Sequence, residues 1–294
     1  MSLESTLSSW TGPSSATEQD KQERTERMIR EAVRAHSAFD DCSLSVYPKG
    51  SYPNNTNVKA DSDVDIAVQC HDVFFYDEAT DGARGTRSPY QGIWTPEKLR
   101  SELETALRAK FPGQVDTSGS TAIGVNSNSS RVDADVVPCF DYRYYFSSGQ
   151  YREGIKIFRS IGGGIHNYPD QHLTNGRAKN NRTSTRFKKA ARIMKRVENA
   201  MLDAGTHREV PSFFIESLVY NCPDEIIKRS TWTDVVKGVI GHIWEELEGD
   251  EPDEESERWF EVNDCKFLFH SAQKWTRKDG RDFVYAAWNH LSLG

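Results

Sequence analysis

Asp63 and Asp65 are separated by a single residue, and a strand-forming run, residues 66–68, follows them. Side chains two residues apart in a β-strand point to the same face, so these two carboxylates would lie side by side. Carboxylates that close repel each other unless a cation neutralises them. Mg²⁺ prefers a few oxygen ligands and leaves positions for substrate phosphates. The spacing therefore predicts a metal-dependent site for nucleotidyl transfer.

A two-metal site needs a further carboxylate from a neighbouring strand, and the segment RVDADVVPCF offers two. Asp135 is favoured because an apolar pair and a proline follow it directly, and Asp133 is the fallback. A single acid in such a pattern fits a core or edge position equally well. We predict Asp63, Asp65 and Asp135 as the catalytic residues and as ligands of two Mg²⁺ ions, for which Mn²⁺ can substitute.

Gly50 and Ser51 precede the aspartate pair by about a dozen residues. Glycine allows the backbone to approach a phosphate closely, and the serine hydroxyl adds a hydrogen-bond donor. A Gly-Ser pair alone normally marks only a turn. Its position upstream of D-x-D favours contact with a nucleotide phosphate.

The elements around these residues predict an α+β fold. A mixed β-sheet with a long N-terminal helix forms a catalytic core over residues 20–172, after a flexible lead-in over 1–19. A C-terminal helical bundle follows over residues 173–294. The predicted helices cover 20–39, 96–110, 183–202, 211–220, 232–247 and 266–291, and the predicted strands cover 43–47, 63–70, 115–125, 131–140 and 142–158.

Composition narrows the class of protein. No apolar run among the 294 residues approaches the ~20 that span a bilayer, so we expect no membrane partner. The net charge of −7 disfavours a long nucleic acid as the main partner. The N-terminus does not resemble a secretory signal, and we expect a cytoplasmic protein. The cysteines are odd in number, form no C-x-x-C pair and argue against structural zinc: Cys42, Cys70, Cys139, Cys222 and Cys265.

Residues 177–196 carry nine basic residues and no acid, whereas residues 245–257 carry nine acids. Lys188, Arg192 and Lys195 form one ridge of the predicted helix. For any one of them a solvated cationic face is the simpler interpretation. Together, in a protein of negative net charge, they point to a polyphosphate ligand. We interpret the acidic run as a solvated loop.

Gly50-Ser51, the DSDVDI run of residues 61–66 and the DVVP run that opens at Asp135 resemble the signature of polymerase-β-type nucleotidyltransferases. The later segments HNYPDQHLTNGRAKN, FKKAARIMKR and PSFFIESLVYNCPDE resemble the bacterial CD-NTases, which are cyclic GMP–AMP synthase/DncV-like nucleotidyltransferases of CBASS anti-phage systems. The resemblance covers roughly residues 20–290. It implies a polymerase-β-like catalytic core, two Mg²⁺ ions and NTP substrates, with ATP, GTP and UTP as the candidates.

The resemblance also implies a cyclic di- or trinucleotide second messenger and a separate effector protein that responds to it. Lys195 matches the helix lysine that holds the triphosphate, and Ser212 matches the serine that opens the next helix. Phe213 matches an aromatic residue that can stack on a base. Lys188 joins this nucleotide-binding set from the basic ridge. The zinc-binding Cys/His insertion of the animal enzyme is absent, so no obligatory long nucleic acid is expected. Side chains that could read a base edge are Asn167, Asn175, Asn180 and Asn181.

Two other interpretations stay open on the sequence. One is an RNA 3′-end or protein nucleotidyltransferase of the same fold, of the CCA-adding, poly(A)-adding or toxin–antitoxin type. The other is a degenerate module that only binds a nucleotide or a protein. Pyrophosphate release from NTPs alone, without an RNA acceptor, separates both from a signal synthase.

Overall fold

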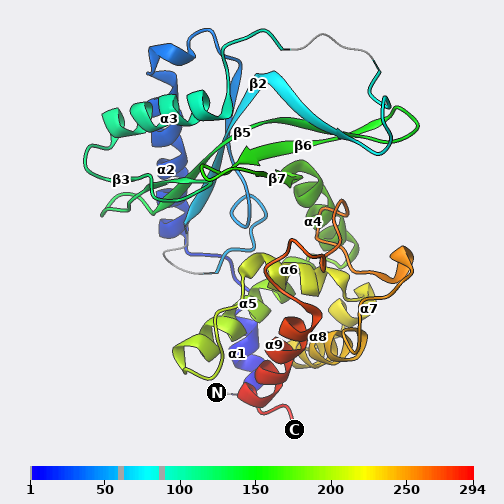
Figure 1. The fold of residues 1–294 in the computed structure, drawn as a ribbon. Helices are drawn as coiled ribbons and strands as arrows, with labels where there is room; N and C mark the ends of the chain where they lie inside the picture. The colour runs from blue at the N-terminus through cyan, green and yellow to red at the C-terminus, as the bar shows by residue number, and fades with distance from the viewer. Residues whose placement is uncertain (1, 59–62, 86–89) are drawn as a thin grey trace. The chain divides into compact units, whose positions relative to one another are not determined.

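The computed structural model describes residues 2–58, 63–85 and 90–294, and the chain forms two compact units (Figure 1). The sheet unit comprises Ser14–Pro53 and Lys59–Pro169. The helical unit comprises Met1–Pro13, Asn54–Val58 and Asp170–Gly294. The division between residues 169 and 170 lies three residues before the predicted boundary. Residues 61 and 62 of the DSDVDI run lie outside the described residues.

The sheet unit is built on a seven-stranded mixed sheet of order β1-β2-β5-β4-β3, in which β6 pairs with β5 and β7. Only β2 and β5 are parallel among these pairs, and they lie side by side in Figure 1. The α+β fold with a mixed sheet is therefore confirmed. The strands are β1 (Leu44–Pro48), β2 (Val64–Glu78), β3 (Val115–Asp116), β4 (Ile123–Val125), β5 (Ala134–Tyr145), β6 (Tyr151–Phe158) and β7 (Gly164–Asn167).

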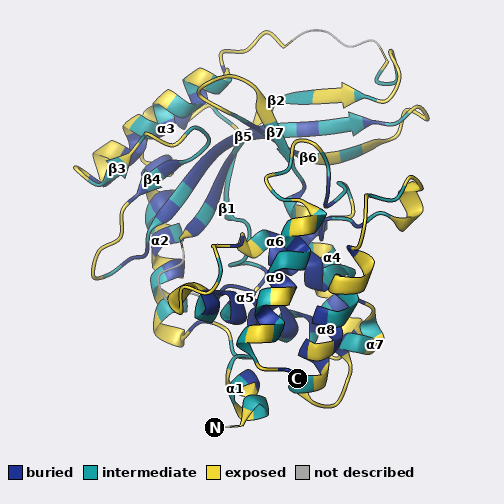
Figure 2. Cartoon of the chain, turned by 60° about the horizontal axis from the view of Figure 1, so that its bottom comes forward, coloured by how far each residue is buried: buried dark blue, intermediate teal, exposed yellow. Residues whose placement is uncertain are grey.

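The two faces of this sheet carry different side chains because successive residues of a strand alternate. Even-numbered residues of β2, such as Ile66 and Val68, pack in one core with residues of α2 (Ala16–Arg34) and α3 (Pro96–Lys110). Odd-numbered residues, such as Ala67, form a smaller cluster with partners from β5 and β6. Figure 2 shows much of β5 buried, and the first half of β2 is buried as well. The odd face is the one on which Asp65 lies.

Helix α2 begins four residues earlier than predicted because of a capping box. The Ser15 side chain accepts a hydrogen bond from the Glu18 amide, and the Glu18 carboxylate accepts one from the Ser15 amide. The helix ends at Arg34, and a short 3₁₀ turn, Ser37–Phe39, follows. Helix α3 begins at Pro96, after the capping residue Thr95, and has the predicted bounds.

The helical unit encloses the second large core, formed by residues of α1, α5, α6, α8 and α9 among others. Leu7 of α1 is fully buried in it, and the Glu4 carboxylate accepts hydrogen bonds from the first amides of α8. The flexible lead-in predicted for residues 1–19 is thus replaced by a packed helix and the start of α2. The helices of this unit are α1 (Leu3–Ser9), α4 (Pro169–Arg182), α5 (Phe187–Asp203), α6 (Ser212–Asn221), α7 (Asp224–Ile227), α8 (Trp232–Glu246) and α9 (Arg277–His290), with a 3₁₀ turn at Glu255–Glu257.

Three elements of this unit differ most from prediction. Helix α4 occupies residues for which the sequence predicted neither a helix nor a strand. Helix α5 begins at Phe187, because Ser184 and Thr185 have φ angles of 52° and 63°, which a right-handed helix excludes. Helix α9 begins at Arg277, where Thr276 and Asp279 form a capping box. Within the described ranges, every helix is too short or too polar to cross a membrane.

Candidate active site

The register of the two parallel strands sets the first part of the site. Asp65 of β2 is paired with Asp135 of β5, at the beginning of both strands. Neighbouring strands lie about 4.8 Å apart, so the two backbones carry these carboxylates at the same level on the odd face. Asp63 directly precedes β2. The predicted trio therefore comes from two adjacent strands.

Electrostatics show that these carboxylates are close to one another. Burial raises the pKa of the Asp135 carboxyl above its usual value, and the charges of Asp65 and Asp63 raise it further. Lys49 opposes the shift, and its ammonium donates a hydrogen bond to Asp65 Oδ1 at 3.2 Å. Among the described residues, Lys49 is the cation that lowers this pKa, whereas three aspartates raise it, so the described part of the cluster retains negative charge.

Asp133, the fallback ligand, is hydrogen-bonded to the turn before β5. It lies just before β5, and its Oδ1 accepts a hydrogen bond of 2.5 Å from the Ser127 amide. Its backbone carbonyl accepts one from the Val64 amide at 3.0 Å. These bonds give Asp133 a role in ending the turn between β4 and β5, and the register favours Asp135 as the partner of Asp65.

The Gly50-Ser51 turn lies directly against Asp65. The Lys49 amide donates to the Asp65 carbonyl at 2.9 Å, which extends the ladder between β1 and β2. Gly50 has a φ of 75°, and a Cβ atom at this position would lie 2.7 Å from Asp65 Oδ2. Only glycine fits both conditions. The glycine of the predicted phosphate turn thus also leaves room for the Asp65 carboxylate.

The donor set of this site fits the predicted metal. Asp63, Asp65 and Asp135 offer carboxylate oxygens, which are the ligands that Mg²⁺ prefers. Burial and then the negative charges of Asp65 and Asp63 raise the pKa of Asp135, and a divalent cation would relieve this repulsion. The arrangement can hold a cation beside a turn that can contact a phosphate.

In the helical unit, Lys195 is 2% exposed and is surrounded by acceptors. Its ammonium donates to the Thr56 carbonyl at 3.1 Å, to Thr56 Oγ1 at 3.2 Å and to Glu216 Oε2 at 2.6 Å. These bonds use all three N–H donors of a lysine. The predicted contact of Lys195 with a triphosphate would require some of them to break.

Glu216 is the centre of this buried cluster, and sequence reasoning did not single it out. Its carboxylate also accepts from the Thr56 hydroxyl at 2.5 Å and lies 3.1 Å from His172 Nε2. Burial alone would raise the pKa of Glu216, but the Lys195 ammonium and His172 outweigh it and hold the pKa far below its usual range. The available signal was a single acidic residue within the mostly apolar run SFFIESLVY, which indicates a buried charge that needs a partner.

The basic ridge is therefore partly internal. Arg192 is buried and donates hydrogen bonds to the carbonyls of Thr11 and Asn55, and burial lowers its pKa to about 10. Lys188 is only half-buried, and burial lowers its pKa as well. In the described part of the chain, its ammonium has no hydrogen-bond or ion-pair partner. Lys188 is the ridge cation that remains available to a ligand.

The other two predicted nucleotide-binding residues of the helical unit differ in exposure. Ser212, the first residue of α6, is exposed. The Phe213 ring is half-buried, with its centroid 5.5 Å from that of His172 and 6.1 Å from that of Trp275. Both positions are accessible to a ligand of the helical unit.

Two of the four asparagines proposed for base reading are already bonded. The Asn180 side chain accepts from the Lys188 amide, and the Asn175 side chain donates to Asp264. Asn181 is exposed beyond them. Asn167 is half-buried at the end of β7 in the sheet unit, opposite Ile155 of β6.

Comparison with known proteins identifies the class. The family model of the cGAS/DncV-like nucleotidyltransferase C-terminal helical domain matches residues 174–292. A cyclic dipyrimidine nucleotide synthase CdnE from Cecembia lonarensis is 37% identical over 293 residues, which cover 99% of this chain and 98% of that protein. The chain belongs to the CD-NTase family.

Two solved CD-NTase structures share the whole fold. The CdnE cyclic dinucleotide synthase of Elizabethkingia meningoseptica, with GTP and Apcpp, has a TM-score of 0.82 and 33% identity over 98% of each chain. The CdnE c-UMP-AMP synthase of Rhodothermus marinus, with Apcpp and Upnpp, has a TM-score of 0.84 and 28% identity over 98% of this chain and 96% of that one. This CD-NTase is a nucleotidyltransferase that synthesises a cyclic nucleotide, and the relatives do not support the RNA-adding and non-enzymatic interpretations.

Gly50→Ala is expected to lower kcat/KM for NTP turnover by at least about tenfold, because the new Cβ displaces the Asp65 carboxylate and small misplacements at a reacting centre are costly. Gly113→Ala is the matched control. Gly113 has nearly the same φ, 73°, but a Cβ added there would meet no atom within 4 Å, so this variant tests backbone strain alone. Steady-state pyrophosphate release measures both variants. Equal activities of the two variants would contradict the proposed role of the close contact.

Proposed function

We propose that this CD-NTase condenses two NTPs, one of them UTP, into a cyclic dinucleotide with release of pyrophosphate. The observation that carries the proposal is the pairing of Asp65 with Asp135 beside the Gly50-Ser51 turn. Asp63, Asp65 and Asp135 would hold two Mg²⁺ ions, for which Mn²⁺ can substitute. When bound, Mg²⁺ neutralises charge on the phosphoryl oxygens and lowers the pKa of the attacking hydroxyl.

The chain's own residues position the reactants and move the proton. A ribose hydroxyl oxygen forms a bond to the α-phosphorus of an NTP, and the bond from that phosphorus to the bridging oxygen of pyrophosphate breaks. Asp135 accepts the hydroxyl proton, and its register with Asp65 places it at the reacting centre. The Gly50 backbone and the Ser51 hydroxyl hold the phosphates. A second round within the linear intermediate closes the ring.

In the helical unit, we assign Lys188 and Ser212 to phosphate contacts and Phe213 to stacking on a base. Lys188 has a free ammonium among the described residues, and Ser212 and Phe213 are accessible. Lys195 is assigned a supporting role, in which it neutralises the buried Glu216. We assign the reaction to the cytoplasm and propose a separate effector protein as the partner that responds to the product.

We propose UTP as one of the two substrates, and uracil as its base, for two reasons. The Cecembia relative is named as a cyclic dipyrimidine synthase, and the Rhodothermus structure contains Upnpp. The side-chain amide of Asn167 offers both a donor and an acceptor, which match the adjacent acceptor and donor on the edge of uracil. We therefore propose Asn167 as the residue that reads the uracil edge.

Purified protein incubated with each labelled NTP, alone and in pairs, with Mg²⁺ or Mn²⁺ tests this function. The expected product resists phosphatase, has the mass of a cyclic dinucleotide and requires UTP. A product made only from purine nucleotides would overturn the base choice. If no combination gives a product, the proposed activity is overturned.

In the same assay, Lys188→Ala should raise the KM for NTP more than it lowers kcat. Lys189→Ala, which changes the adjacent cation, should leave KM unchanged.

A further inference from the structure

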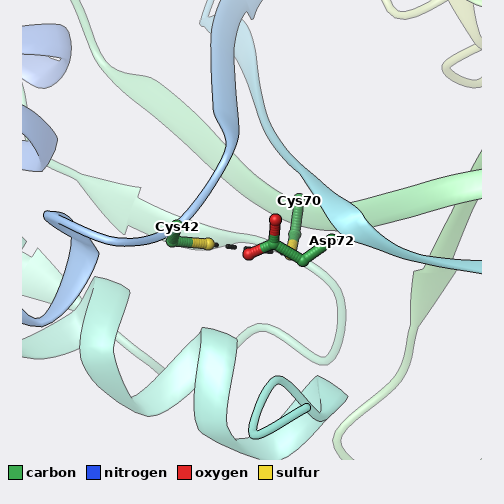
Figure 3. A group of neighbouring side chains, drawn as sticks. All are labelled: Cys42, Cys70 and Asp72. Carbon is green, nitrogen blue, oxygen red and sulfur yellow. Dashed lines mark hydrogen bonds between the residues drawn. The ribbon is translucent and has the colours of Figure 1, made fainter. Parts of the chain in front are cut away.

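Two cysteines that are 28 positions apart in the sequence meet in the sheet unit. The Sγ atoms of Cys42 and Cys70 lie 3.8 Å apart. A carboxylate oxygen of Asp72 joins them, and the three ligand atoms all lie within 4.8 Å of one another. Figure 3 shows the three side chains converging, Cys42 from the segment before β1 and the other two from β2. A separation of 28 residues is not a recognised metal-binding spacing, so the sequence alone does not indicate this group.

The β1–β2 ladder determines this meeting. Leu44 pairs with Cys70, and the His71 amide donates to the Ser43 carbonyl at 2.9 Å, which continues the antiparallel register by one step. The next step places Cys42 opposite Asp72. The pairing of β2 with β5 shifts register between Cys70 and Phe74, and at this irregularity the Asp72 carboxylate lies beside both sulfur atoms. The three ligand atoms are therefore held by the backbone of two paired strands.

This cluster is separate from the active site. Cys70 is five residues further along β2 than Asp65, which corresponds to about 17 Å of strand. It also lies on the even face, among residues of the core that α2 and α3 cover, whereas Asp65 lies on the odd face. The proposed reaction uses none of these three side chains.

The spacing of the sulfur atoms matches the geometry of a tetrahedral zinc site. Zinc binds thiolate sulfur at about 2.3 Å, and two such ligands at the tetrahedral angle lie about 3.8 Å apart. A disulfide requires a sulfur separation of about 2.05 Å, much shorter than the observed distance. A carboxylate is an accepted third ligand of zinc, and thiolates select zinc over Mg²⁺.

Zinc binds cysteine as the thiolate, so binding of one ion would release the protons of Cys42 and Cys70 and replace the hydrogen bond between the two sulfur atoms.

A route to the group exists. Cys42 lines a hollow of about 560 Å³, together with residues such as Arg34, Asp40 and Tyr47. Asp72 is exposed, whereas Cys70 is fully buried. An ion can therefore enter from the hollow, and a water molecule from the same side can complete a fourth position.

We propose that Cys42, Cys70 and Asp72 bind one zinc ion, with water as the fourth ligand. The ion joins the segment before β1 to β2, the strand that carries Asp65 at its other end. The site is structural, because it lies on the opposite face of the sheet from the reacting groups. This proposal is independent of the base choice and of the nucleotidyl transfer mechanism.

Titration of the reduced full-length protein with Cd²⁺ or Co²⁺, in excess Mg²⁺, tests the site through the thiolate charge-transfer absorption of the bound metal. One equivalent is expected to bind, and Zn²⁺ should displace it. Cys42→Ser is expected to abolish the absorption, and Asp72→Asn should weaken the affinity by at least about tenfold, since it removes a direct ligand. Cys265→Ser, which changes a half-buried thiol of the helical unit, should leave the titration unchanged.

Circular dichroism of each variant shows whether it is folded, and Cys70 is left intact because its side chain is fully buried. No charge-transfer absorption in the wild-type protein would overturn the proposal, and so would an absorption that survives Cys42→Ser in full. Thiol counting adds a further test. The protein has five cysteine thiols, and they can be counted without added reductant. If two of them have been oxidised, and the reduced protein still binds no Cd²⁺, then Cys42 and Cys70 form a disulfide and the zinc site is disproved.

Discussion

Asp135→Asn is expected to reduce nucleotide turnover by at least about 10³-fold. The substitution removes a side chain that we propose as both a metal ligand and the proton acceptor. Metal stabilisation of the transition state contributes several kcal/mol, with each 1.36 kcal/mol equal to a factor of ten in rate. Asparagine keeps the size and half of the hydrogen-bonding capacity of the side chain. Pyrophosphate release under saturating NTP and Mg²⁺ measures the loss.

The same substitution should raise the Tm of the metal-free protein. Folding raises the pKa of Asp135 above its usual value of 3.8, so the folded state binds this proton more readily than the unfolded chain does. The stability contributed by Asp135 is therefore highest at pH below about 3.8 and is lost as the pH rises through the folded pKa. At pH 7 with EDTA, we expect an increase in Tm on the order of 2 °C, which disappears near pH 3.5.

Asp133→Asn is the matched control for both measurements. Asp133 lies two residues away, its carboxylate accepts from the Ser127 amide, and its charge contributes least among the causes of the raised pKa of Asp135. This variant should retain most of the activity and show a smaller rise in Tm than Asp135→Asn. Full activity in Asp135→Asn, or equal losses in the two variants, would rule out the assignment of Asp135.

The sequence predicted the parts of this protein that depend on local pattern. Strand alternation was enough to propose Asp63 and Asp65 together, and the apolar run after Asp135 identified β5. Helix α3 has the predicted bounds because Thr95, Pro96 and its apolar stripe are local signals. The resemblance to CD-NTases added the family, which the comparisons confirm.

Other features depend on residues far apart in the chain and left little local trace. The spacing of Lys188, Arg192 and Lys195 predicts one basic ridge. Lys195 is nevertheless buried, because its ammonium bonds to Thr56, which lies 139 positions earlier in the chain. Helix α1 is held by contacts with α8, more than 200 positions later. Helix α4 has a weak apolar stripe, with His172, Gly176 and Lys179 as its buried residues, so a periodicity test cannot detect it.

The cysteines illustrate the same limit. Metal-binding motifs are recognised by short spacing, and Cys42 and Cys70 have none. They meet because the two strands are antiparallel, and their register is determined by the alternation of apolar residues over β1 and the paired first half of β2. The prediction that these cysteines argue against zinc rested on spacing alone, and titration with Cd²⁺ or Co²⁺ decides between it and the proposed site.

Glu216→Gln is expected to lower the free energy of unfolding by about 3–5 kcal/mol, because it leaves the buried Lys195 ammonium without a compensating charge. Glu209→Gln is the control, since Glu209 is exposed in the same unit. Denaturant unfolding at pH 7 measures both variants. A loss for Glu216→Gln no larger than that of the control would show that the pair contributes little.

The pH dependence of this loss follows from the depressed pKa of Glu216. Its charge stabilises the folded state fully above the unfolded value of about 4.5, and the contribution is lost as the pH falls towards the folded pKa. The difference between wild type and Glu216→Gln should therefore be constant from pH 6 to 8 and shrink below about pH 4.5.

A double variant separates the structural role of this pair from a role in binding nucleotide. Lys195→Met alone leaves a buried carboxylate and should destabilise the helical unit, whereas Lys195→Met with Glu216→Leu removes both charges and should recover most of the stability. If Lys195 only neutralises Glu216, the folded double variant should bind NTP with a nearly unchanged KM. A KM raised by about tenfold or more in a stable double variant would show that the Lys195 ammonium leaves Glu216 and contacts the triphosphate during turnover.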